Sequence, residues 1–292
     1  MKNSIPILQI PQEIQNLCQS YKDDFTVPQF KYFENFITGI IINDQADISA
    51  LSQGFQQRKR YDNFHHFVSE SNWDMKDIMK TSVSVIKHLP DKNKRFSSKG
   101  WLVIDDSLIE KFGKMMEAVS KQYDHSEQRY LKHAHCLVAL TYTDKNGNRY
   151  PINFDLYQTE KDCECLKIKF RSKIKIATEL IQYAIDQGIP FQGVLFDSWY
   201  FCKEMVDFIE KENKDWVSIV KSNRNFVHQG KTISFKNYAK TITTKEKRKM
   251  KTIEIESGDE DSQIKKYRYQ SIKKSLPSLK RNKKNYSHCS FL

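Results

Sequence analysis

The sequence predicts an α/β (α+β) protein in which a small all-helical domain precedes a mixed β-sheet flanked by helices. Three observations support this fold class. Apolar residues recur at helical spacing between Pro28 and Leu89. After residue 100 the pattern changes to short apolar runs, which are typical of buried strands. A long amphipathic segment then lies between two of those runs, as a helix does when it connects strands of one sheet.

The N-terminal part of the chain predicts a helical domain. Residues 1–27 contain two prolines and show no periodicity, so we expect an irregular segment there. From Pro28 onwards the apolar positions fall three and four residues apart, on one face of a helix. Asp47 and Asn72 are expected to cap two later helices. Four short helices are therefore expected in a domain that spans residues 1–90.

A change of pattern marks the start of the predicted sheet. Residues 91–100 are polar and basic and are expected to form a linker. Trp101–Ile104 is an apolar run that predicts a short buried strand ended by two aspartates. Residues 133–143 and 149–157 are rich in β-forming residues and flank a turn sequence that contains Asn-Gly. Two such runs around Asn-Gly predict a β-hairpin.

The following segments alternate between helix and strand. Leu166–Gln187 predicts one long amphipathic helix, with a glycine placed to cap its C-terminus. Gly193–Phe196 and Trp216–Val220 are apolar runs and predict two more buried strands. Trp199–Lys211 predicts a helix between them. The order of these elements favours a mixed sheet with helices on its faces.

We interpret residues 101–222 as one core domain that contains the predicted sheet. Beyond it the charge becomes dense, and residues 223–278 are expected to form a small β insertion region. Residues 279–292 lack periodicity and are expected to be an aberrant tail. The strands of the β region are expected at 231–236, 250–256 and 264–272.

The composition limits the class of protein. The 292 residues include 48 Lys and Arg against 36 Asp and Glu, a net charge of +12 at neutral pH. Such an excess of positive charge points to an anionic partner, of which nucleic acid is the commonest. No apolar run approaches the length of a membrane span, and the six cysteines are too few and too scattered for a disulfide scaffold. We therefore expect a cytoplasmic protein that has a nucleic-acid partner and no membrane partner.

Acidic residues follow two of the predicted strands. Asp106 ends the run V-I-D-D, and Asp197 ends V-L-F-D. Because ligands bind at the carboxyl ends of strands in such sheets, these two carboxylates are candidates for a shared Mg²⁺ or Mn²⁺ site. The alternative is that both aspartates cap turns, a common role for this residue. A zinc site is a weaker alternative, because Cys-x2-Cys is absent; its ligands would be His133, His135, Cys136, Cys163 and Cys165.

Longer motifs around these acids resemble a known family. The stretch WLVIDDSLIEKFGKMMEAVSKQY, followed by RYLKHAHCLVALTY, is similar to the start of the catalytic domain of DDE-class insertion-sequence transposases. GVLFDSWYFCKEMVDFIEK, followed by WVSIVKSNR, resembles the region of their second catalytic aspartate. The likeness covers about residues 28–272. It implies an RNase H-like sheet, Mg²⁺- or Mn²⁺-dependent cleavage of transposon ends, transfer to target DNA, and a homo-oligomer on the DNA of the bacterial nucleoid.

The resemblance assigns roles by position. Asp106 and Asp197 match the two catalytic, metal-binding aspartates, and the helical domain resembles the end-binding region of the same proteins. Asp105 is the alternative metal ligand, because neighbours on a strand point in opposite directions and only one of the pair faces the metal. Asp106 is favoured. The basic residues expected to contact DNA are Arg58, Lys59, Arg60, Lys111, Lys221 and Arg224.

The third acid of that family has no counterpart in this sequence. The family carries it as a glutamate on a later helix, whereas Ser262–Leu292 contains nine Lys and Arg and no acid. The acidic residues from 254 to 261 are typical of a solvated loop. We therefore expect a truncated or shifted reading frame and a copy that lacks the third catalytic carboxylate. The alternative is a non-catalytic DNA-binding remnant that occupies transposon ends or inhibits a full-length partner.

Overall fold

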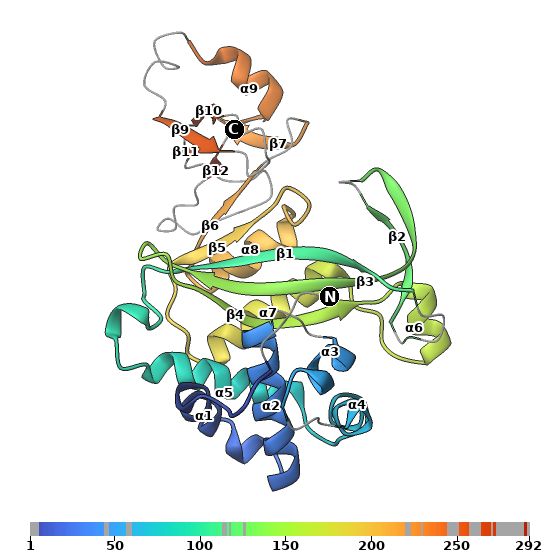
Figure 1. The fold of residues 1–292 in the computed structure, drawn as a ribbon. Helices are drawn as coiled ribbons and strands as arrows, with labels where there is room; N and C mark the ends of the chain where they lie inside the picture. Colours follow the sequence, from blue (N-terminus) through green and yellow to red (C-terminus); the bar gives the residue numbers. More distant parts are fainter. Residues whose placement is uncertain are drawn as a thin grey trace. The chain divides into compact units, whose positions relative to one another are not determined.

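Two compact units make up the chain, Met1–Lys92 and Asn93–Leu292. We call them the helical unit and the sheet unit and describe each by itself (Figure 1). The computed structural model describes residues 6–43, 47–56, 60–112, 116, 118–124, 127–219, 223–228, 230–243, 251–256, 264–269, 271–272 and 289–290.

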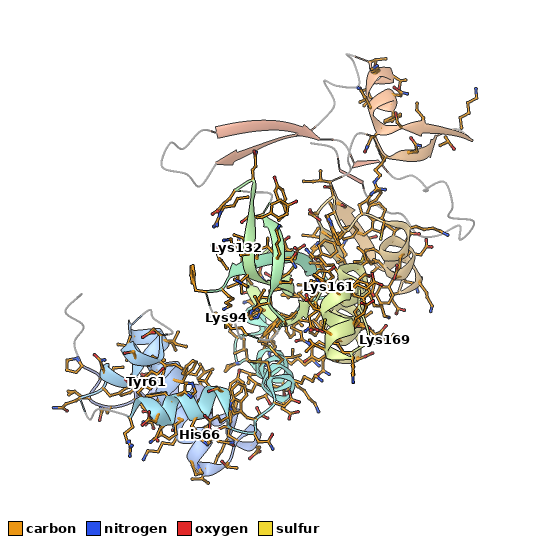
Figure 2. The ribbon with its side chains drawn as sticks, turned by 90° about the vertical axis from the view of Figure 1, so that its right-hand side faces the viewer. Tyr61, His66, Lys94, Lys132, Lys161 and Lys169 are labelled. Carbon is orange, nitrogen blue, oxygen red and sulfur yellow. The ribbon has the colours of Figure 1, made fainter. Side chains whose placement is uncertain are left out.

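The helical unit consists of short helices, as predicted. Figure 2 shows Tyr61 and His66 on one of them, α4, and both side chains are exposed. The elements are α1 (Gln12–Gln19), a 3₁₀ turn (Lys22–Asp24), α2 (Val27–Asn43), α3 (Ile48–Gln53), α4 (Tyr61–Ser69) and α5 (Met75–His88), with a second 3₁₀ turn (Lys92–Lys94) at the boundary.

The ends of these helices correct two expectations. The segment before residue 27 contains α1 and is not irregular, because Pro11 stands at the N-cap position, where a missing N–H costs nothing. Asp47 caps α3 as expected, since its carboxylate accepts a hydrogen bond from the backbone N–H of Ala50. Asn72 does not cap α5. Asp74 does so, through a 2.8 Å bond from the N–H of Lys76.

Aromatic side chains fill the centre of the helical unit. Phe64 is fully buried and Phe67 nearly so, and the Phe67 ring stacks on Trp73 at 5.6 Å. The indole N–H of Trp73 donates to the backbone carbonyl of Phe67 at 2.6 Å, so the polar atom of this large side chain is paired. Phe25 and Phe33 stack at 4.7 Å beside them. This cluster holds the ends of the helices together.

The sheet unit contains a six-stranded mixed sheet. Five strands follow the order β2-β3-β1-β5-β6, and the sixth strand, β4, also pairs with β3. β3 runs antiparallel to its neighbours, whereas β1, β5 and β6 are parallel. Four strands in antiparallel pairing, β1 to β4, and two strands parallel to β1 confirm the mixed sheet of the predicted fold class. The strands are β1 (Trp101–Glu110), β2 (Ser120–Asp124), β3 (Arg129–Thr143), β4 (Arg149–Tyr157), β5 (Gly193–Phe196) and β6 (Asp215–Ser218).

Helices cover one face of this sheet (Figure 1). α7 (Lys173–Asp186) packs against β3 and β4 and contacts α8 (Lys203–Lys211), which packs against β6. Alternate residues of β1 and β3 are buried beneath them, among them Leu102, Ile104 and Val138. A side chain at Gly193 would meet the backbone oxygen of Asp215 at 2.5 Å, so only glycine permits β5 and β6 to lie this close.

Several predicted elements differ from the structure. β1 continues to Glu110, so both aspartates lie inside a strand and not at its end. The helix expected over 166–187 begins only at Lys173, because Ser172 caps α7. α6 (Glu160–Leu166), which was not predicted, precedes it and ends at Lys167, which adopts a left-handed conformation. α8 begins at Lys203 and not at Trp199. β2 was not predicted.

The region after residue 222 contains a helix as well as strands. β8 ends at Ser234, whose side chain caps α9 (Phe235–Thr241), so the strand predicted over 231–236 is two residues too long. The strands predicted near 250–256 and 264–272 are present. A short strand also lies in the expected tail. The elements are β7 (Asn225–His228), β8 (Lys231–Ser234), β9 (Lys251–Glu256), β10 (Ile264–Tyr269), β11 (Ser271–Ile272) and β12 (Cys289–Ser290).

None of the helices in the part of the chain described by the structure has the length and apolar character needed to cross a bilayer.

Candidate carboxylate site of the sheet unit

Asp197 lies where β5 ends beside β1. The two strands are parallel, and Phe196 is in register with Ile104. The chain turns directly after Phe196, and the Asp197 carboxylate fixes the turn: its Oδ1 accepts hydrogen bonds from the backbone N–H groups of Trp199 at 2.8 Å and Tyr200 at 3.2 Å. This is the turn-capping role considered as the alternative, and it engages one of the two carboxylate oxygens.

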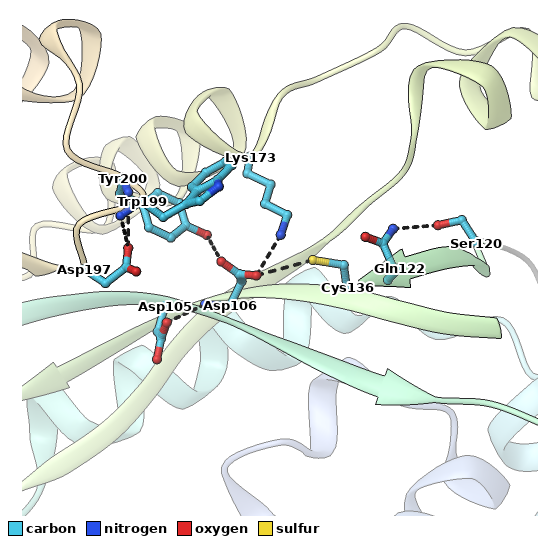
Figure 3. A network of polar contacts seen from close by, with 9 residues as sticks. All are labelled: Asp105, Asp106, Ser120, Gln122, Cys136, Lys173, Asp197, Trp199 and Tyr200. Atoms are coloured by element: carbon cyan, nitrogen blue, oxygen red, sulfur yellow. Dashed lines mark hydrogen bonds and ion pairs between the residues drawn. The ribbon is translucent and has the colours of Figure 1, made fainter. Parts of the chain in front are cut away.

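Asp106 lies on the helix-covered face of β1. Its side chain follows Leu102 and Ile104 in the alternation of the strand, and only 21% of it is exposed. Oδ2 lies 2.8 Å from the ammonium of Lys173 and accepts a weak 3.6 Å contact from the thiol of Cys136. Oδ1 accepts a 3.0 Å hydrogen bond from the hydroxyl of Tyr200 (Figure 3). Asp106 is therefore at the centre of a half-buried polar network.

Asp105 points to the opposite side of the strand (Figure 3). Its Oδ1 accepts a 2.9 Å hydrogen bond from the backbone N–H of Asp106. β5 has already ended at this level, so the carboxylate supplies the partner that a neighbouring strand would otherwise provide. Partial burial raises the pKa of the Asp105 carboxyl, the N–H bond opposes this, and the charges of Asp106 and Asp197 raise the pKa further.

Lys173 approaches the network from the first turn of α7. A cation at a helix N-terminus is unfavourable because that end carries a partial positive charge. Helix stability therefore does not explain the position of Lys173, whereas its ion pair with Asp106 does. The ammonium also lies 5.2 Å from the ring centre of Trp199 and 5.5 Å from that of Tyr157. Burial lowers the pKa of Lys173, but the hydrogen bond to Asp106 and the surrounding negative charge raise it overall.

Tyr200 links the two aspartates. Its backbone N–H bonds Asp197, and its hydroxyl bonds Asp106. The side chain is fully buried, and this burial, together with the charge of Asp106, raises the pKa of the Tyr200 hydroxyl far above its ordinary value. The hydroxyl therefore stays protonated and acts as a fixed donor. Burial likewise raises the pKa of the Cys136 thiol, which stays neutral.

The residues fit a divalent ion that is held partly by protein and partly by substrate. Carboxylate oxygens are the donors that Mg²⁺ prefers, usually one or two of them together with phosphate. Oδ2 of Asp197 accepts no hydrogen bond from any residue that the structure describes. Within that part of the chain no three His, Cys, Asp or Glu side chains form a metal-binding group, so the zinc alternative has no support.

Three of the six predicted DNA-binding residues lie in the part of the chain that the structure describes. Arg60 is exposed and lies 3.5 Å from Asp62 in the helical unit. Lys111 follows the end of β1, and Arg224 directly precedes β7. None of the three makes a hydrogen bond or ion pair with Asp106 or Asp197. Arg58, Lys59 and Lys221 lie outside the described residues.

Lys173 and Cys136 were not predicted as members of the site. The available signal was the sequence K-I-K-F-R-S-K-I-K from Lys167 to Lys175, which places a lysine in the first turn of a helix. That position is disfavoured for a cation and therefore indicates a nearby negative group. Of the acids considered as replacements for the missing glutamate, Glu254 and Glu256 lie on β9, and those from 259 to 261 fall outside the described residues.

The chain is similar to known transposases. A curated relative, a probable transposase for insertion sequence element IS701 from Microchaete diplosiphon, is 24% identical over 214 residues, which cover 72% of this chain and 54% of the relative. The chain thus spans about half the length of the curated relative that it matches. A solved Drosophila P element transposase strand transfer complex aligns over 77% of this chain and 55% of that one, with 11% identity and a TM-score of 0.32.

The match to a protein family covers most of the chain. Residues 40–272 correspond to the family described as DDE superfamily endonuclease. This range includes both aspartates, the network around Asp106 and all strands of the mixed sheet. The resemblance seen in the sequence motifs is confirmed: the chain belongs to the DDE superfamily endonuclease family.

Proposed function

We propose that the protein is the transposase of a bacterial insertion sequence, binding transposon ends and catalysing metal-dependent DNA strand cleavage and strand transfer. The observation that carries the proposal is that Asp106 lies on β1 and Asp197 directly follows β5, the parallel neighbour of β1, within the range matched by the family. The substrate would be the DNA of the nucleoid, which places the protein in the bacterial cytoplasm. Assembly as a homo-oligomer on the two transposon ends is part of the same proposal.

Asp106 and Asp197 are the residues that would hold the divalent ion. When bound, Mg²⁺ or Mn²⁺ would polarise the phosphodiester and stabilise the charge that develops on its oxygens. The chain's own groups prepare this site. The turn N–H groups fix the orientation of Asp197, and the Tyr200 hydroxyl fixes that of Asp106. The Asp105 carboxylate accepts a hydrogen bond from the backbone N–H of Asp106 on one face of β1. The divalent ion would lie on the opposite face, with Asp106.

Lys173 balances the charge of Asp106 in this arrangement. A divalent ion at Asp106 would compete with the ammonium, and the displaced ammonium would remain within reach of a phosphate. The third carboxylate of the family pattern is absent from this chain in our proposal. Cleavage by this chain alone is therefore expected to be weak, because two carboxylates orient the ion and the attacking water less well than three.

Nicking of supercoiled plasmid in Mg²⁺ or Mn²⁺ tests the proposal. Asp106→Asn and Asp197→Asn should each reduce the nicking rate by at least about a hundredfold, as the loss of a main stabilising group does. Asp186→Asn is the matched control, because Asp186 is exposed at the end of α7 and far along the helix from Lys173. Nicking that persists in both active-site variants, or that survives a chelator, would overturn the proposal.

A second candidate function is DNA binding without cleavage, by a transposase remnant. The observation that favours it is the ion pair itself: Lys173 already neutralises Asp106, and among the described residues no further acid completes a three-residue metal-binding group with the two aspartates. The same assay separates the two. A wild-type protein that retards plasmid DNA in gels but does not nick it in either metal would support the remnant and exclude the enzyme.

A further inference from the structure

A run of alternating basic residues lies beside the carboxylates. We define the basic strap as Lys167–Lys175, the segment that leaves α6 and enters α7. Every second residue in it is a cation, and no acid occurs between Glu164 and Glu179. Figure 2 shows Lys161 and Lys169 on α6 and on the segment that follows it. The strap ends in the first turn of α7, where Lys173 contacts Asp106.

The cations of the strap differ in how they are neutralised. Arg171 lies 2.7 Å from Asp155 and 3.0 Å from Glu179, so its charge is satisfied within the fold. Lys175 lies 3.5 Å from Glu179. Lys167 and Lys169 are exposed, and the structure records no ion pair for either with the residues it describes. Two unneutralised positive charges therefore stand at the start of the strap. The five cations are Lys167, Lys169, Arg171, Lys173 and Lys175.

Apolar and aromatic side chains alternate with these charges. Ile168 is 47% exposed and Phe170 is 37% exposed. The Phe170 ring packs edge-on against Tyr157 at 6.3 Å, and the Tyr157 ring lies 5.5 Å from the ammonium of Lys173. On the other side of that ammonium is Trp199, which is 46% exposed. Exposed rings therefore continue from the strap to the edge of the carboxylate site.

This combination matches the chemistry of a nucleic-acid strand. Cations neutralise phosphates, and exposed rings provide faces on which bases and sugars stack. Exposed cations alone, or exposed rings alone, are common on protein surfaces and identify no ligand. Here both lie on one segment, and that segment leads to the aspartates.

We propose that the basic strap binds the sugar-phosphate backbone of the DNA strand whose phosphodiester lies at Asp106 and Asp197. Lys167 and Lys169 contact successive phosphates, and Phe170 contacts a sugar or base between them. Lys173, the cation of the strap that contacts Asp106, lies at the reacting phosphate. This inference rests on the proposed function, since it takes the aspartates as the place where DNA is cut.

The test is the salt dependence of DNA binding. Affinity for a fluorescein-labelled duplex is measured by anisotropy between about 50 and 200 mM salt for the full chain and for a Lys167→Ala/Lys169→Ala variant. Each lost phosphate contact reduces the slope of log affinity against log salt by about 0.9, so the double variant should lose about 1.8 and bind roughly tenfold more weakly at low salt. Phe170→Ala should weaken binding without changing the slope.

The matched control is Lys99→Ala/Lys145→Ala. Both lysines are exposed, and both lie at the end of the sheet where β1 begins, because Trp101 pairs with Thr143 beside the β3–β4 turn. The strap follows the other end of β4. The control removes the same charge, so a purely general loss of positive charge would affect both double variants equally, and that result would overturn the inference.

Other outcomes separate the inference from the proposed function. An unchanged slope in the strap variant, with the wild-type protein still nicking DNA, would overturn the strap and leave the enzyme intact. A wild-type protein that neither binds duplex nor nicks plasmid would overturn both. Thermal melting of each variant confirms that the comparison is made between folded proteins.

Discussion

The helical unit and the sheet unit bury different kinds of side chain. The centre of the helical unit is aromatic, with Phe64 and Phe67 almost completely excluded from water. In the sheet unit the buried face of β1 carries Leu102 and Ile104 and then, next in the alternation, the half-buried Asp106 paired with Lys173. The first arrangement stabilises a fold in proportion to the apolar area it buries. The second must overcome the cost of removing two charges from water.

This difference separates two classes of residue. Replacing a buried ion pair by apolar groups is often neutral or stabilising, so a fold does not need such a pair for its stability. The aromatic cluster of the helical unit holds elements together. We assign the Asp106–Lys173 pair of the sheet unit, together with Tyr200, to the proposed catalytic function. Variants in the two places should therefore respond to different measurements.

The largest expected effect is on the stability of the helical unit. Phe64→Ala should lower the free energy of unfolding by about 3–5 kcal/mol, because a fully buried ring leaves a cavity. Urea unfolding followed by circular dichroism measures this loss. Tyr61→Ala on the same helix is the control; that ring is 49% exposed and its removal should cost less than about 0.5 kcal/mol. Equal losses of unfolding free energy in Phe64→Ala and Tyr61→Ala would contradict the view that the buried aromatic cluster stabilises the helical unit.

Removing the cation of the Asp106–Lys173 pair should make the thermal stability of the protein depend on divalent metal. Lys173→Met leaves Asp106 half-buried without its cation, so the melting temperature should fall in a chelator and recover in Mg²⁺. At a hundredfold excess over its dissociation constant a ligand adds about 2.7 kcal/mol. Lys175→Met, two residues further along α7 and exposed, is the control. An identical response to Mg²⁺ in Lys173→Met and in wild type would contradict this role.

The pH dependence of a buried thiol gives a smaller effect in the helical unit. Burial, assisted by the charge of Glu34, raises the pKa of Cys18 from 9.0 to about 11. Between these two values the unfolded chain has released the proton and the folded chain has not. Stability is therefore full below pH 9 and falls as the pH rises towards 11, by up to about 2 kcal/mol.

Two measurements check this expectation. Cys18 should resist alkylation at pH 8 in the folded protein, whereas the exposed Cys165 reacts. Unfolding by urea at pH 8 and at pH 10.5 should show a larger drop for wild type than for Cys18→Ala, which has no thiol to titrate. A rapid reaction of Cys18 at pH 8 would mean that this part of the helical unit opens readily.

The smallest effect concerns a single helix cap. Asp74→Ala removes the acceptor for the N–H of Lys76 at the start of α5 and should cost about 1 kcal/mol. Asp77→Ala is the control, because Asp77 lies in the first turn without a capping bond. Urea midpoints that shift equally for the two variants would show that charge near the helix terminus, and not the cap, provides the stability.

Periodicity predicted the fold class and most of the elements of the sheet unit. The strands of the β3–β4 hairpin and β5 appear where alternating or continuous apolar residues indicated them, because their burial is set by local pattern. Features that depend on tertiary contact could not be predicted. β1 continues past Ile104 because β3 pairs with it as far as Glu110, and the polar residues from Asp105 to Ser107 do not indicate that partner.

Two acids of the candidate site, Asp106 and Asp197, were predicted from the sequence, whereas its cation, Lys173, was not. Asp106 and Asp197 follow apolar runs that end in acidic residues, a pattern visible in one dimension. Lys173 is 67 residues from Asp106 along the chain and meets it only after α7 packs on β3. The late start of α7 was also missed, because the apolar spacing after Leu166 fits one continuous helix.

The hydrogen bond from the Asp106 N–H to the Asp105 carboxylate has a consequence for how this sheet meets other chains. The same device recurs on β4, which pairs only with β3 among the described strands. There the side chains of Asn153 and Asp155 each accept from the N–H of the next residue, at 2.8 Å. An outward N–H that is already bonded cannot join the ladder of an incoming strand. The acidic and amide side chains thus block strand addition along open stretches of backbone, which protects the sheet against edge-to-edge aggregation and directs association to side-chain surfaces.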